Sequence, residues 1–215
     1  SPEQVAEMRH GYFAGISCID AQIGMVIAAM NEHGMLENTV IVFWGDHGYH
    51  LGEHGLWAKT SNFELDARVP FIIAAPQAKQ HGVQSASLVE MLDIFPTLNA
   101  LCGLPPAPGL EGTSLVPVLD DPAAMVKPAA FTQHPRPPYP DRTPDKQPTH
   151  MGYSVRTARW RYTEWRNWKT GEVEARELYD HSSDQPELDN VVANPPDAAA
   201  LEEAKESGWE GVVRV

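Results

Sequence analysis

The segment from Thr39 to Asn62, TVIVFWGDHGYHLGEHGLWAKTSN, constrains the fold and the chemistry of this chain more than any other. It opens at 39–44 with β-branched and aromatic residues typical of a buried strand, and Gly45 ends this run. Asp46 and His47 follow directly, which puts a carboxylate and an imidazole just beyond the strand. In open α/β sheets, ligands bind at the carboxyl ends of strands. The segment therefore predicts a functional site after the strand.

The flanking patterns predict an α/β fold. Ser1-Pro2-Glu3-Gln4 is typical of a helix start, and apolar residues then recur every three or four positions from Val5 to Met30. Gly34 is expected to end this helix. A second apolar strand is predicted at 69–76, and a helix at 87–101 that is interrupted or restarted at Pro96.

The last third has a different character. Proline is dense from 105 to 148, which predicts a long surface excursion with short elements. Beyond it, the pattern predicts strands at 153–165 and 172–179, joined by a turn at 167–171, and a short helix near 196–207. We therefore divide the chain into an α/β core at 1–120, a proline-rich excursion at 121–150 and an antiparallel β subdomain with a helix at 151–215.

Composition excludes some partners. The formal net charge of −13 argues against general binding to nucleic acid or anionic membranes, because the long-range field repels polyanions. No apolar run approaches the roughly 20 residues of a membrane span, so we expect no such span. Cys18 and Cys102 lack metal-type spacing and lie in apolar helical patterns, so we expect buried free thiols.

An Asp-His pair beyond a strand can bind a divalent cation. The carboxylate suits hard Ca²⁺ or Mg²⁺ and the imidazole suits softer metals, so the pair alone does not identify the metal. The alternative is that Asp46 caps the following turn and His47 only hydrogen-bonds within the loop. Lys59, after a glycine-rich stretch, could place a fixed cation over an anionic substrate. Its alternative is a solvated surface lysine.

A zinc-peptidase interpretation also arises from this segment. His50, Glu53 and His54 fit the H-x-x-E-H pattern, which requires a helix that places both histidines on one face. Glycines in or beside the segment disfavour that helix, because each interior glycine costs about 1 kcal/mol.

Several separated motifs in one order identify a family. Residues 45–64 (GDHGYHLGEHGLWAKTSNFE) resemble the second metal-binding segment of the sulfatases, within the alkaline-phosphatase-like superfamily, and most closely their iduronate-2-sulfatase branch and bacterial relatives. The other matching motifs lie at 1–4, 69–70, 93–97, 133–137, 151–157, 161–163 and 177–180. The resemblance covers roughly residues 1–192, and it implies an α/β sandwich of the alkaline-phosphatase type with a small C-terminal antiparallel β subdomain.

The resemblance also implies roles for particular residues. Asp46 and His47 would ligate an active-site Ca²⁺, and Lys59 would contact the sulfate and its bridging oxygen. Positions that shape the sugar pocket in the iduronate-type enzymes correspond to Tyr49, Arg136 and Arg156. The implied substrate is a sulfated carbohydrate, and the implied location is the periplasm, the lysosome or the extracellular space.

The departure from the family pattern concerns the nucleophile. Sulfatases use a formylglycine made from Cys or Ser in a C/S-x-P-x-R motif, together with an N-terminal pair of metal-binding aspartates. Cys18 precedes Ile-Asp-Ala-Gln and Cys102 precedes Gly-Leu-Pro-Pro, so neither cysteine fits. The chain therefore resembles the C-terminal half of a sulfatase, with the N-terminal half as expected partner, and is predicted to be inactive alone. The alternatives are a phosphodiesterase or phosphonate hydrolase of the same superfamily, or a non-catalytic metal-binding fragment.

Overall fold

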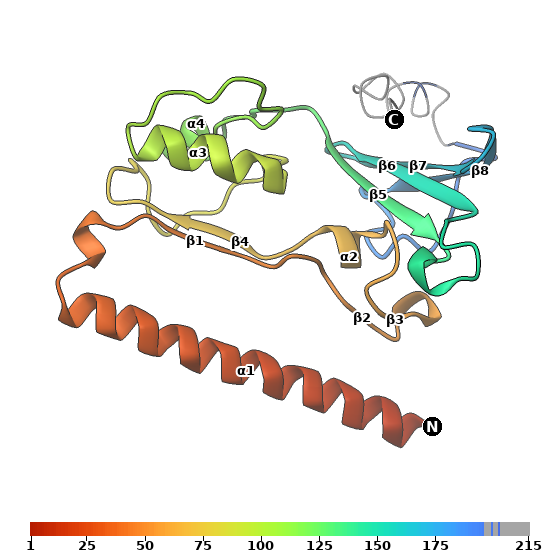
Figure 1. Cartoon of the computed structure of the whole chain (residues 1–215), viewed down its shortest axis with the longest axis horizontal. Helices are drawn as coiled ribbons and strands as arrows, with labels where there is room; N and C mark the ends of the chain where they lie inside the picture. Colours follow the sequence, from red (N-terminus) through yellow and green to blue (C-terminus); the bar gives the residue numbers. More distant parts are fainter. Residues whose placement is uncertain (196–198, 200–201, 203–215) are drawn as a thin grey trace.

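A computed structural model describes residues 1–195, 199 and 202 of the protein (Figure 1). A long helix, α1 (Pro2–Glu32), lies along one side of the molecule, apart from a two-stranded sheet and a cluster of short helices. A four-stranded sheet lies at the end of the molecule away from α3 (Ile94–Leu101) and α4 (Val116–Asp120). The other short helical elements are η1 (Leu36–Asn38), η2 (Glu53–Gly55), α2 (Glu64–Ala67), η3 (Met91–Asp93) and η4 (Pro140–Arg142).

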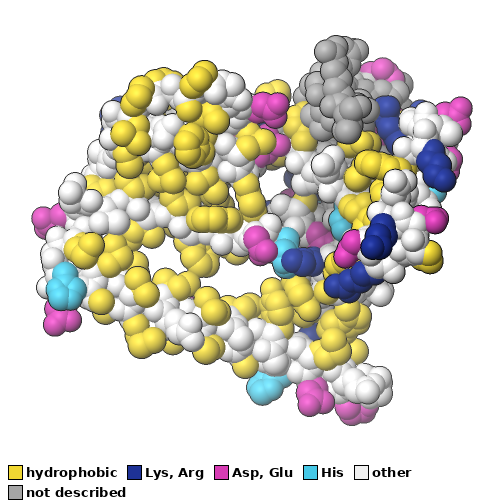
Figure 2. All heavy atoms as spheres, in the orientation of Figure 1, with side chains coloured by type: hydrophobic (Ala, Val, Ile, Leu, Met, Phe, Trp, Pro, Cys, Tyr) yellow, Lys and Arg dark blue, Asp and Glu magenta, His cyan; other side chains and the backbone are white. Residues whose placement is uncertain are grey.

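Helix α1 begins and ends where the sequence predicts. Ser1 is the N-cap, its hydroxyl accepts a hydrogen bond from the Gln4 backbone N–H, and Pro2 opens the helix. Gly34 follows the C-cap with a φ of +64°, a conformation that glycine adopts without steric cost. No residue of α1 is buried, however, and Figure 2 shows hydrophobic side chains along much of its length.

Among the described residues, α1 is the one helix long and apolar enough, by length and composition, to cross a membrane. Signal sequences and core helices of soluble proteins share this length and apolar composition, so these features alone do not make α1 a membrane span. The predicted absence of a membrane span is therefore not confirmed.

The two predicted apolar strands pair with each other. β1 (Ile41–Trp44) and β4 (Phe71–Ala74) form an antiparallel pair, in which Trp44 is opposite Phe71. The expectation that the first strand is buried is wrong for this chain, because Trp44 is 45% exposed. Both cysteines are also exposed, which corrects the expected burial of their thiols. The apolar patterns predicted the elements correctly, but the described chain supplies little to cover them.

The C-terminal sheet contains the hydrophobic core. It consists of β5 (Ala130–Arg136), β6 (His150–Arg156), β7 (Trp160–Asn167) and β8 (Val173–Asp180), all antiparallel and in sequence order. The core of this sheet is formed by side chains from each of its four strands or their ends, namely Ala129, Tyr153, Val155, Trp160, Tyr162 and Leu178.

The sheet differs from the prediction in two places. The strand expected at 153–165 is two strands, β6 and β7, joined by a turn in which the Trp160 N–H donates to the Thr157 hydroxyl (3.0 Å). β5 lies within the stretch assigned to the proline-rich excursion. The turn predicted at 167–171 is confirmed, with Gly171 at a φ of +73°. The helix predicted near 196–207 lies almost wholly outside the described residues.

Candidate active site

Asp46 and His47 follow the carboxyl end of β1, as predicted, and their side chains face each other. The Asp46 Oδ2 and His47 Nε2 atoms lie 3.4 Å apart, and the Asp46 side chain is 81% exposed. His47 Nδ1 lies 2.7 Å from the Gly48 carbonyl oxygen, which can only accept, so Nδ1 carries the proton. With the proton on Nδ1, the Nε2 atom keeps its lone pair and lies beside the Asp46 carboxylate, so the two groups could bind one cation together.

Gly48 brings this pair against the segment that precedes β4. Its N–H donates to the Asp66 carbonyl oxygen at 2.8 Å. A Cβ at position 48 would lie 1.8 Å from the Leu65 carbonyl oxygen, closer than any atom can approach. Only glycine therefore allows this contact, which fixes the Asp46–His47 loop next to α2.

Asp66 connects the two halves of the site, and the sequence analysis did not select it. Its Oδ2 accepts hydrogen bonds from the Thr60 N–H (3.0 Å) and the Ser61 hydroxyl (2.6 Å). The same oxygen lies 3.4 Å from Nε2 of the buried His50. Asp66 thus holds the residues after Lys59 against β2 (His50–Leu51), the short strand that follows His47 and pairs with β3 (Trp57–Ala58).

Lys59 lies at the other side of the site. Ala58, just before it, has a φ of +68°, a conformation that non-glycine residues rarely adopt and that concentrates at functional positions. Within the described part of the chain, no hydrogen bond or ion pair engages the Lys59 ammonium. His47 and Lys59 line one hollow of about 320 Å³, which we call the Lys59 hollow. Its lining also includes Asn62, Asp66, Thr132 and His134.

The other three predicted site residues do not line this hollow. Tyr49 stacks on Tyr12 of α1, with ring centroids 4.9 Å apart. Arg136 donates to the Thr60 carbonyl oxygen and lies over the Trp165 ring, and burial lowers its pKa. Their roles in substrate binding stay predictions.

Arg156 makes an ion pair with Glu64 (Nε to Oε2, 3.3 Å) instead of facing the hollow. Burial lowers its pKa. Arg136 therefore contacts Thr60 beside Lys59, and Arg156 contacts Glu64 at the start of α2, so in this structure both tie this segment to the C-terminal sheet. A direct contact of Arg156 with substrate likewise stays a prediction.

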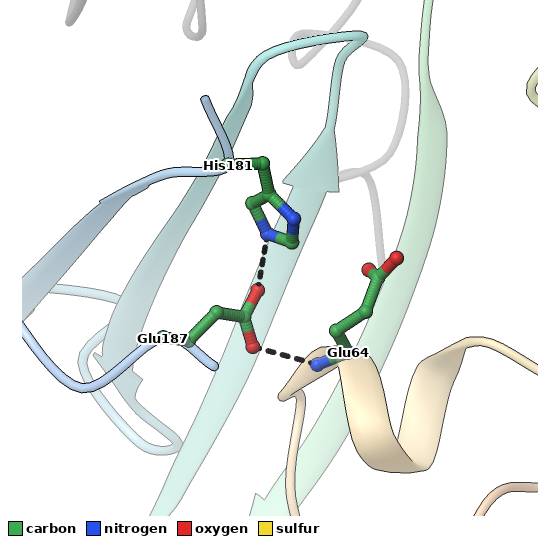
Figure 3. Close-up of side chains that lie close together, drawn as sticks. All are labelled: Glu64, His181 and Glu187. Carbon is green, nitrogen blue, oxygen red and sulfur yellow. Dashed lines mark hydrogen bonds and ion pairs between the residues drawn. The ribbon is translucent and has the colours of Figure 1, made fainter. Parts of the chain in front are cut away.

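A cluster of Glu64, His181 and Glu187 (Figure 3) has the spacing of a metal site. Two contacts are drawn, from His181 Nε2 to Glu187 Oε1 (2.7 Å) and from the Glu64 N–H to Glu187 Oε2 (2.6 Å). The buried Arg161 donates to both carboxylates and Arg156 also pairs with Glu64, so two guanidinium charges offset the two carboxylates without a metal ion. Burial raises the pKa of Glu187, but the hydrogen bond from His181 and the Arg161 charge outweigh it and lower the net pKa. The cluster therefore ties the start of α2, shortly after Lys59, to the C-terminal sheet.

The zinc-peptidase alternative does not fit the backbone. His54 has a φ of +54° and Gly52 a φ of +112°, so no continuous helix carries His50 and His54. His54 Nε2 instead contacts the Pro186 carbonyl oxygen at 2.7 Å.

Comparisons with known proteins agree with this architecture. The sulfatase family profile matches residues 1–104. Mouse (Mus musculus) iduronate 2-sulfatase is 34% identical over an alignment that covers 86% of this chain and 44% of the enzyme. The chain thus spans less than half the length of this curated relative.

Two solved structures share the fold. BT4656, solved in complex with its substrate D-glucosamine-2-N,6-O-disulfate, has a TM-score of 0.78 at 26% identity, over 91% of this chain and 38% of that one. A phosphonate monoester hydrolase from Silicibacter pomeroyi has a TM-score of 0.71 at 27% identity, over 90% and 38%. The predicted α/β fold of the alkaline-phosphatase type, with a C-terminal antiparallel sheet, is confirmed. Residues 1–104 match the sulfatase family, and the chain as a whole resembles the C-terminal half of sulfatases.

Proposed function

We propose that this chain is the C-terminal portion of a sulfatase that hydrolyses sulfate esters of a sugar, such as 2-sulfated iduronate. The observation that carries the proposal is the meeting of His47 and Lys59 at one hollow, with Asp46 beside His47. A carboxylate–imidazole pair, together with an ammonium that no described residue engages, suits an anionic ester whose hydrolysis develops further negative charge. The similarity to iduronate 2-sulfatase supports a sugar sulfate as substrate.

The donors at positions 46 and 47 lie close enough to share one divalent cation, and the resemblance to the sulfatases favours Ca²⁺. Two ligands of one ion, each bound at about 2.3–2.6 Å, lie within about 5 Å of each other, and Asp46 Oδ2 and His47 Nε2 are 3.4 Å apart. The His47 Nδ1–H bond to a backbone carbonyl is the arrangement that orients metal-binding histidines. We propose that these two residues supply part of the coordination shell.

Within the proposed site, Lys59 would bind the sulfate and its bridging oxygen, and its charge would stabilise the leaving alcohol. Asp66 would keep Lys59 in place through Thr60 and Ser61. A formylglycine and a Ca²⁺ ion, when present, would supply the nucleophile and neutralise charge on the sulfate. The nucleophile would lie in the N-terminal half of the enzyme, the proposed partner of this chain, so the 215 residues alone should not hydrolyse sulfate esters.

The second candidate function is hydrolysis of phosphonate or phosphate esters. The fold similarity to the Silicibacter pomeroyi phosphonate monoester hydrolase favours it specifically. A third possibility, a non-catalytic metal-binding polypeptide, would retain Ca²⁺ without turnover.

The test is Lys59→Ala in the full-length enzyme, assayed with a 2-sulfated iduronate disaccharide and with matched phosphate and phosphonate esters. We expect kcat on the sulfate ester to fall about 10²–10³-fold, the usual effect of removing one group that stabilises developing charge. Lys79→Ala is the matched control, because Lys79 is exposed and its ion pair among the described residues is with Asp120 on the surface. Unchanged turnover in Lys59→Ala would remove Lys59 from the mechanism, and turnover of the phosphonate ester alone would favour the second function.

A further inference from the structure

The Lys59 hollow has a polar wall that the proposed chemistry does not use. Thr132 and His134 lie two residues apart on β5, so their side chains project from the same face of the strand. Arg136, two residues further along that face, reaches the Thr60 carbonyl oxygen. This face of β5 therefore lies against the loop that carries Lys59.

Polar atoms without hydrogen-bond partners gather around the Lys59 hollow, both on β5 and at positions 62 and 66. Thr132 Oγ1, His134 Nε2 and Asn62 Oδ1 are each buried and make no hydrogen bond within the described structure. Asp66 Oδ1 is a fourth such atom, although its other carboxylate oxygen is fully engaged. Buried polar atoms are satisfied in the great majority of proteins, and each one left unsatisfied costs about 1–3 kcal/mol. Four of them around one hollow indicate that something polar completes their hydrogen bonds.

The chemistry of the wall selects the kind of ligand. A hydroxyl, an amide oxygen and an imidazole are short-range hydrogen-bonding groups, and Asp66 adds a carboxylate acceptor. Burial, followed by the nearby Arg136 charge, lowers the pKa of His134, so its imidazole is neutral near pH 7. Such a set matches the hydroxyl groups of a sugar. A flat aryl group would leave these atoms unpaired.

We propose that Thr132 and His134, with Asn62, form the subsite that binds the hydroxyl groups of the sugar carrying the sulfate, and this inference rests on the proposed sulfatase function. His134 Nε2 contacts a sugar hydroxyl, while His47 and Lys59 hold the sulfate end of the same molecule. The hollow, about 320 Å³, is near the lower end of the range for small-ligand pockets, and so suits one sugar ring.

The test compares two substrates of the full-length enzyme, a 2-sulfated iduronate disaccharide and p-nitrophenyl sulfate. In His134→Ala we expect kcat/KM for the disaccharide to fall about tenfold, the size expected for one lost hydrogen bond. The fall for p-nitrophenyl sulfate should be no more than about threefold, because that substrate has no sugar hydroxyls. Thr132→Val removes a hydroxyl at nearly constant volume. It should likewise lower kcat/KM for the disaccharide more than kcat/KM for p-nitrophenyl sulfate.

A conservative variant and a control separate binding from structure. His134→Gln keeps a hydrogen-bonding group and should recover part of the disaccharide activity. His81→Ala, in an exposed loop, should leave kcat/KM unchanged for both substrates. Equal losses on both substrates, or no loss on either, would overturn the inference. If the wild-type enzyme hydrolyses neither sulfate, the proposed function fails. Calorimetric binding of the disaccharide, about tenfold weaker in His134→Ala, then still decides whether the subsite exists.

Discussion

The β1–β4 pair and the C-terminal sheet differ in how their apolar side chains are covered. In the C-terminal sheet, Val155, Tyr162 and Leu178 have no exposed surface. In the β1–β4 pair, Trp44 is 45% exposed and Ile72 is 58% exposed. Figure 2 shows hydrophobic side chains on both sides of the opening between α1 and this pair. One region holds its own core, and the other has apolar surface facing open space.

This difference follows from how each region is built. The four strands β5–β8 are consecutive in sequence and pair with their neighbours, so their core forms from residues within about 50 positions of each other. The elements of the first region are those of an α/β sandwich, in which helices and strands need layers on both faces of the sheet. Since the chain spans 44% of iduronate 2-sulfatase, we propose that the N-terminal half of the enzyme supplies those layers.

The largest effect is expected in the C-terminal core. Leu178→Ala should lower the free energy of unfolding of the 215-residue chain by about 2–5 kcal/mol, because it leaves a cavity where a fully buried side chain stood. Guanidinium unfolding, followed by far-UV circular dichroism, measures the change. A loss below about 1 kcal/mol would mean that the C-terminal sheet is not the stable core of the chain.

Local patterns predicted the elements of both regions because their signals are short in range. The capping box at Ser1 and the helix end at Gly34 depend on contacts within a few residues. The turn between β6 and β7 was missed, because it has no glycine or proline and is held by the Thr157 hydroxyl. Burial was overestimated at Trp44 and Cys18, because periodicity marks an apolar face without saying what covers it.

The site was only partly predictable for a similar reason. Asp46, His47 and Lys59 lie in one glycine-rich segment, so the sequence alone predicted that they lie near one another. Asp66 lies two residues beyond the matched motif, and its role depends on contacts with three separate positions. His134 is about 75 residues from Lys59 in sequence. It lies in the matched motif at 133–137, but that motif alone does not show that this strand faces the Lys59 hollow.

A smaller effect is expected from acid, and it should also be concentrated in the C-terminal sheet. The pKa of Asp180 is lowered first by its hydrogen bonds from Arg159. Glu187 and Glu164 also have lowered pKa values, although burial opposes the shift in each. Glu177 differs, because burial raises its pKa. A lowered pKa in the folded state gives stability that is present above the unfolded value and lost as pH falls through the folded value.

Stability should therefore decrease as pH drops below about 4.5, by about 2 kcal/mol in total, the scale for one strongly paired carboxylate. Denaturant unfolding at pH 7 and pH 3 measures the loss, and amide hydrogen exchange in β7 and β8 locates it. Arg159→Ala removes the main partner of Asp180 and should reduce the pH dependence. Equal stability at the two pH values would contradict the importance of these paired carboxylates.

The smallest effect is expected at the exposed face of α1. Ile16 is 52% exposed, so Ile16→Ala in the 215-residue chain should change the unfolding free energy by less than about 0.5 kcal/mol. The higher helix propensity of alanine offsets part of the lost apolar contact. In the full-length enzyme the same substitution should cost about 2–5 kcal/mol, because the N-terminal half would bury this position.

Leu178→Ala is the control for this comparison, because a self-contained core should lose the same stability in the short chain and in the full-length enzyme. If Ile16→Ala lowers the unfolding free energy by less than about 0.5 kcal/mol in both proteins, the N-terminal half of the enzyme does not cover α1. The length and apolar composition of α1 would then favour a lipid surface, and flotation of the chain with phosphatidylcholine vesicles tests that directly. A rise in cost confined to Ile16 would show that the first region is half of a core whose other half lies elsewhere in the enzyme.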